Sequence, residues 1–128
     1  MKTQYVAALA VAAGFGLGAA MVQGLHAQAK LPAFTIAEID VSDMDGFQKE
    51  FAPKAQKAIA DNGGKALARG GKVVGLYGAP PKNRIAVNRF DGLDQALAAY
   101  NSAAYKEAKA IGDKFATFRI IAVEGLAQ

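Results

Sequence analysis

Four segments of the chain have the composition and the hydrophobic period of β-strands. Three of them are 33–41 (AFTIAEIDV), 84–90 (RIAVNRF) and 117–124 (TFRIIAVE). The fourth is interrupted, because the pair Gly70-Gly71 separates 65–69 from 72–77 (KVVGLY), where the β-forming pattern resumes. We therefore expect the second strand in two parts or with a bulge at the glycines.

A first helical region is expected after residue 43, where apolar residues begin to recur at every fourth position instead of every second. Its apolar face consists of Phe47, Phe51, Ala55 and Ile59. Ser42 and Asp43 supply an N-terminal cap. Pro53 falls inside the pattern and is expected to begin a second helical segment, since the first turn tolerates a missing N–H. Asn62-Gly63-Gly64 then ends the helix.

A second helical region follows the third strand. Asp91 is expected to cap it, and Asp94 three residues later suits a helix N-terminus. Its apolar stripe is expected to be Leu93, Leu97 and Tyr100. Ser102 is expected to cap a further helix over about 103–114.

The resulting order is strand, helix, two strands, helix, strand. This order predicts an α+β fold of the ferredoxin-like β-α-β-β-α-β type, with an antiparallel sheet and helices on one face. In a monomer the other face would be polar, but the strands are apolar in both registers, as when Phe34 and Ile36 alternate with Ala37 and Ile39. We therefore expect a homodimer that pairs sheet against sheet.

The first 29 residues have the features of a Sec-type signal peptide. Lys2 precedes an uncharged Ala/Gly-rich run, and Ala27-Gln28-Ala29 has the small-x-small pattern of a cleavage site. Cleavage after Ala29 would leave residues 30–128 as one periplasmic or secreted domain without membrane attachment. The alternative is an uncleaved anchor, but a spanning helix needs roughly 20 strongly apolar residues, and this run is shorter and rich in glycine.

Composition excludes several chemistries. The chain has no cysteine, and its single histidine, His26, lies in the expected signal peptide. The mature domain would then lack the groups of Ser-His and Cys-His catalysis, of ordinary zinc sites and of haem ligation by imidazole or thiolate. We expect neither a metal nor a cofactor. The net charge of +4 is spread rather than gathered on one face, so we expect no nucleic-acid partner.

Several short motifs follow one another in an order that marks a family. They are Ala37-Glu38-Ile39-Asp40-Val41 with Asp43, Asn62-Gly63-Gly64-Lys65, Ala68-Arg69-Gly70-Gly71, Arg84 to Phe90, Tyr100-Asn101-Ser102 with Tyr105, and Val123-Glu124-Gly125. Together they resemble the bacterial family called domain of unknown function 1330. The resemblance implies a ferredoxin-like fold of the dimeric α/β-barrel type and implies no reaction. The wider fold group includes cofactor-independent oxygenases, isomerases and haem-handling enzymes, but fold alone does not carry function.

Five residues are candidates for a ligand site. Arg69 could clamp a carboxylate or form a structural ion pair with Glu38 or Glu124. Glu38, Arg89 and Glu124 interrupt apolar strands, and a glutamate buried there would be a candidate acid or base. Tyr105 is either core with its hydroxyl at the rim or part of a binding pocket.

Three functions remain open. The first is a dimeric module that binds a small ligand, with an anion as one candidate, between sheet and helices. The second is a cofactor-independent oxygenase or isomerase, and the third is a purely structural dimer. The glycine-rich stretch 63–71 suits turns better than phosphate binding, because it lacks the Gly-Lys-Ser/Thr ending and leads into a strand.

Overall fold

The computed structural model describes residues 31–127 of the chain, and the signal peptide expected over residues 1–29 lies outside the described residues. The elements, in order, are β1 (Ala33–Val41), α2 (Met44–Gly46), the π-helical turn η1 (Phe47–Phe51), α3 (Ala52–Asp61), β2 (Lys65–Arg69), β3 (Arg84–Phe90), α4 (Leu93–Asn101), α5 (Ala103–Gly112) and β4 (Ala116–Glu124). None of the helices in this part of the chain is long and apolar enough to span a membrane.

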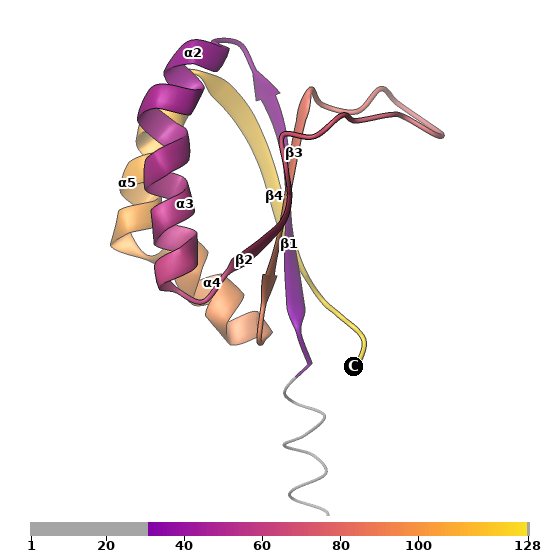
Figure 1. The fold of residues 1–128 in the computed structure, drawn as a ribbon, viewed down its shortest axis with the longest axis vertical. Coiled ribbons are helices and arrows are strands. Elements are labelled where there is room, and N and C mark those ends of the chain that lie inside the picture. Colours follow the sequence, from indigo (N-terminus) through magenta and orange to yellow (C-terminus); the bar gives the residue numbers. More distant parts are fainter. Residues whose placement is uncertain (1–30, 128) are drawn as a thin grey trace, which may run out of the picture. The chain divides into compact units, whose positions relative to one another are not determined.

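The four strands form one antiparallel sheet in the order β2-β3-β1-β4. All the helices lie on one side of it (Figure 1). The expected ferredoxin-like α+β fold is therefore confirmed. Side chains of β1 alternate between the faces, so that Ala37 and Ile39 are buried under the helices while Glu38 is on the other face.

The first helical region begins and continues as expected. The carboxylate of Asp43 accepts a hydrogen bond from Gly46 N at 3.1 Å. The amide of Ala52 then bonds to the carbonyl of Phe47, five residues back, which makes η1 a π-helical turn. Pro53 follows in the first turn of α3, a position that suits the fixed φ of proline. Gly63, with φ of 86°, ends the helix in the left-handed conformation.

The core between helices and sheet combines many alanines with a few large rings. Buried alanines come from both layers, and Phe47 and Phe90 are the largest fully buried side chains among the described residues. Phe51 lies 4.9 Å from Phe47 and 5.1 Å from Phe118 between ring centroids. Such ring contacts stabilise a core beyond the area that they bury.

The expected strand over 72–77 is wrong, because that stretch belongs to a loop that runs from residue 70 to residue 83. The amide of Gly70 makes the last ladder hydrogen bond, 3.3 Å from Ile85 O. β3 begins only at Arg84, so 72–77 has no strand opposite it, and β-forming residues without a neighbour do not make a strand. A register shift does occur in β2, but at Leu67 rather than at the glycines.

Two expectations for α4 are also wrong. Its N-cap is Gly92 rather than Asp91, whose carboxylate instead pairs with Arg89 at 3.2 Å. The expected apolar stripe is wrong only at Leu97, which is half exposed, since Leu93 and Tyr100 pack against the core. Ala96 and Ala99 are the fully buried residues of this helix. The cap of α5 is confirmed, since Ser102 Oγ accepts a hydrogen bond from Tyr105 N at 3.2 Å.

The close contact of α5 with the phenylalanine rings gives a test of this packing. A Cβ on Gly112 would lie 2.5 Å from Phe51 Cδ1 and 3.0 Å from Phe118 Cζ. We expect Gly112→Ala to lower the free energy of unfolding in urea by about 1–3 kcal/mol, despite the better helix propensity of alanine. Gly71→Ala is the control, since a Cβ there meets nothing within 4 Å. A stabilised Gly112→Ala would contradict the packing.

Candidate functional site

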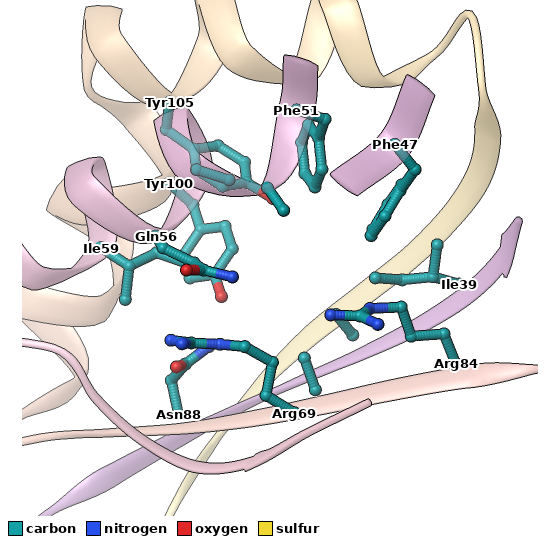
Figure 2. Close-up of a pocket in the computed structure, with 14 residues that line it drawn as sticks. Ile39, Phe47, Phe51, Gln56, Ile59, Arg69, Arg84, Asn88, Tyr100 and Tyr105 are labelled. Atoms are coloured by element: carbon teal, nitrogen blue, oxygen red, sulfur yellow. The ribbon is translucent and has the colours of Figure 1, made fainter. Parts of the chain in front are cut away.

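A cavity of about 50 Å³ lies between the helices and the sheet. This volume is enough for about four water molecules or the acid group of a small molecule. The apolar part of its wall includes Ile39, Phe47, Phe51 and Ile59. Its polar side chains are Gln56, Arg69, Arg84, Asn88, Tyr100 and Tyr105. Figure 2 shows the two tyrosines on one side of the space, the two phenylalanines on the other, and both arginines extending into it from the strands.

The strand register places both arginines on the helix-covered face of the sheet. Arg84 is the first residue of β3 and lies opposite Ile39, which is buried under the helices. Arg69 is the last residue of β2 and lies opposite Ala86, two positions after Arg84 on the same face. Asn88 continues this row and is 4% exposed. The two arginines thus meet because the strands that flank the 70–83 loop are paired.

The two guanidinium groups differ in exposure, since Arg69 is exposed at the end of β2 whereas Arg84 is half-buried. Burial, and secondly the charge of Arg69, lower the pKa of Arg84. The Arg84 guanidinium lies 5.1 Å from the centroid of the Phe47 ring, a cation–π contact. Within residues 31–127, neither Arg69 nor Arg84 forms an ion pair with a carboxylate. An anion in the cavity would therefore relieve the repulsion between two like charges.

The two tyrosines line the side of the cavity opposite the two phenylalanines, and both are neutral hydrogen-bonding groups (Figure 2). The rings of Tyr100 and Tyr105 are 4.6 Å apart between centroids. Burial raises the pKa of both phenols; the charges of Tyr100 and Asp113 raise that of Tyr105 further. Hydrogen bonds with Thr35 and Asn88 partly offset the effect at Tyr100, whose hydroxyl lies 2.9 Å from Thr35 Oγ1. At neutral pH both phenols keep their protons and can donate to a ligand.

Of the five residues proposed from the sequence, the structure brings two together. Arg69 and Tyr105 line the cavity. Glu38 is on the other face of the sheet, where it pairs with Arg119 at 2.7 Å and therefore does not pair with Arg69. The remaining two are outside the cavity as well: Arg89 pairs with Asp91, and Glu124 is exposed at the end of β4.

Sequence reasoning missed Arg84, Asn88, Tyr100 and Gln56 as parts of this cavity. Arg84 and Asn88 were recognisable in principle, because they occupy alternate positions of one strand together with Phe90 and so share its buried face. Tyr100 was assigned to the apolar stripe of its helix, and nothing local distinguishes such a ring from one that lines a pocket. Gln56 carries no sequence signal of its own.

The buried phenols predict a loss of stability at alkaline pH. The pKa of Tyr105 is higher in the folded than in the unfolded chain, where it is about 10, so the folded state binds more protons above that pH and loses stability as pH rises. In urea titrations from pH 8 to pH 11, we expect Tyr105→Phe to lessen this loss. Tyr77→Phe is the control, because Tyr77 is fully exposed. Equal slopes in all three proteins would argue against the burial of Tyr105.

Comparisons with solved structures support the fold. RPA0582, a protein of unknown function from Rhodopseudomonas palustris, has 12% identity and a TM-score of 0.56 over 76% of this chain and 84% of its own. SnoaB, a cofactor-independent oxygenase from Streptomyces nogalater, has 10% identity and a TM-score of 0.55 over 77% of this chain and 96% of its own. At such identities the likeness shows the fold and carries no activity.

The sequence comparison gives the family. No curated protein has a significant match to the chain. The family model for a domain of unknown function, DUF1330, matches residues 32–126, nearly the whole of the described part. The short motifs from Ala37 to Gly125 lie within this match, and the chain belongs to the DUF1330 family.

Proposed function

We propose that this domain binds a small organic carboxylate in the cavity between its helices and its sheet. The observation that carries the proposal is the pair Arg69 and Arg84, which extend into one cavity without a carboxylate partner among residues 31–127. An arginine fork matches the two oxygens of a carboxylate, and such charge-assisted hydrogen bonds are among the strongest in proteins.

The rest of the cavity suits the body of such a ligand. The rings of Phe47 and Phe51 offer an apolar surface, while Tyr105 and the amides of Gln56 and Asn88 offer hydrogen bonds. The cavity volume of about 50 Å³ accommodates the acid group and the first atoms behind it. Because the cavity is open at one side, the remainder of a longer molecule would extend to the solvent.

A cofactor-independent oxygenase or isomerase is the second candidate. Chemistry of that kind begins with removal of a proton from the substrate, for which a base is needed. The raised pKa values of Tyr100 and Tyr105 make both phenols poor bases at neutral pH. Binding through donated hydrogen bonds therefore agrees better with this cavity than proton abstraction does, and a purely structural dimer would leave the arginine pair without a role.

The proposal includes assembly and location. The face of the sheet that the helices leave open carries Phe34, Ile36 and Val87, and cover by a second copy would bury them. We propose that the domain works as a homodimer joined through this face, exported to the periplasm or beyond after removal of residues 1–29.

Calorimetric titration with benzoate tests the binding site, with benzamide as its neutral isostere. We expect the wild-type protein to bind benzoate and to bind benzamide far more weakly. Arg69→Ala and Arg84→Ala should each weaken benzoate binding about 10- to 100-fold, the range for a hydrogen bond to a charged group. Arg69→Lys should retain only part of the affinity, because an ammonium lacks the planar fork.

The control variant is Lys54→Ala, which removes one positive charge from the exposed side of α3. It should leave benzoate affinity unchanged if the arginines act locally rather than through net charge. Equal affinity for benzoate and benzamide would refute a carboxylate site. Binding of inorganic phosphate in preference to benzoate would keep an anion site but replace the proposed ligand class.

A further inference from the structure

The 70–83 loop is the longest segment without helix or strand among residues 31–127. Loops of more than roughly 12 residues are uncommon in compact domains and tend to be functional. It leaves the end of the sheet on the side away from the helices (Figure 1). Its stem is fixed, since Gly70 N bonds to Ile85 O, and Pro80 and Pro81 restrict the backbone of its returning half.

The composition of this loop is unlike that of a solvated surface loop. Val74 is 65% exposed, Leu76 83% and Tyr77 fully exposed. These three side chains, here called the apolar tip, lie within four residues of one another. A group of large apolar side chains at the end of a projecting loop is typical of a surface that contacts another macromolecule.

The open face of the sheet lies on the side toward which this loop extends. Its apolar patch crosses three strands, and its members are Phe34, Ile36, Ile85, Val87, Ile121 and Val123. Two charged pairs border or interrupt it, Glu38 with Arg119 at 2.7 Å and Arg89 with Asp91 at 3.2 Å. Because each of these four charges has its partner in the same subunit, a second molecule can cover the two pairs without separating them.

The area of the open face bears on whether the loop contributes to a dimer contact. Four strands spaced about 4.8 Å apart and about eight residues long offer roughly 500 Å². This is a flat footprint, whereas a standard stable interface buries about 800 Å² of accessible surface on each partner. Any area that the loop adds on the same side would therefore enlarge and stabilise a contact made through the sheet. The loop that carries the apolar tip extends on the same side (Figure 1), and its exposed side chains offer additional apolar area. In a two-fold dimer each contact occurs twice. The loop of one subunit would pack against the second subunit, and the loop of the second subunit would pack against the first in the same way.

We propose that the 70–83 loop is an intersubunit arm, whose apolar tip packs against a second copy of this chain bound at the open face. Each subunit gives one arm and receives one, so Val74, Leu76 and Tyr77 become buried only in the dimer. The arm accounts for the β-forming sequence of 72–77, which pairs with no strand of its own subunit.

Photo-crosslinking tests the contact directly. Tyr77 is replaced with p-benzoylphenylalanine in protein from cells that express the full chain, and this protein is mixed with ¹⁵N-labelled wild-type protein before irradiation. We expect a covalent dimer that joins the photoreactive residue to a ¹⁵N-labelled peptide. The same amino acid at Leu97, which is 49% exposed on the helix side, should give no covalent dimer. Crosslinks confined to the photoreactive residue's own chain would overturn the proposal.

Sedimentation velocity over a dilution series measures the contribution of the arm. We expect Leu76→Asp to raise the dimer dissociation constant at least about tenfold, as for an interface anchor. Leu97→Asp is the matched control and should leave the constant unchanged. A dimer of wild-type strength in Leu76→Asp would overturn the arm while leaving the sheet dimer intact. A monomeric wild type would overturn both, whereas a failure to bind benzoate would affect neither result.

Discussion

Aromatic rings hold the helices and the sheet apart, and the distance between these layers determines what else fits between them. Most residues that face each other across the layers are alanines, too short to set a spacing by themselves. Phe47 and Phe51 fill one end of the space, and Tyr100 and Tyr105 fill the other. Figure 2 shows the cavity between these two groups of rings. Close-packed interiors rarely leave such space, so its polar lining points to a use beyond stability.

Because the helices cover only one face, the two faces of the sheet have different surroundings. On the covered side, Arg69 and Arg84 line one cavity, with a ring beneath Arg84 and no ion-paired carboxylate for either among residues 31–127. On the open side, Glu38 neutralises Arg119 within the subunit. The proposed ligand site and the proposed dimer surface therefore lie on opposite faces of the same four strands.

The sequence predicted those features that depend on neighbours in the chain. Residues 33–41 and 84–90 form strands with the expected bounds, and the caps at Asp43 and Ser102 are confirmed, because period and capping are local. The stretch 72–77 has the composition of a strand but forms a loop, since β propensity takes effect only where another strand is available. Of the polar residues that line the cavity, the sequence predicted only Arg69 and Tyr105. The other polar residues of the cavity come from separate elements whose meeting depends on the register of the whole sheet.

The hydrogen bond from Gly70 N to Ile85 O ends the β2–β3 ladder at the first residue of the 70–83 loop. The length of the loop beyond Gly70 therefore does not affect the strand register. Inserting residues beyond that point would cost only loop-closure entropy, about 0.6 kcal/mol for each doubling of length. Mutation and recombination could therefore lengthen, shorten or replace the loop while Arg69 and Arg84 keep their places at its two ends. Among related proteins, the proposed intersubunit arm can thus diverge faster than the proposed carboxylate site.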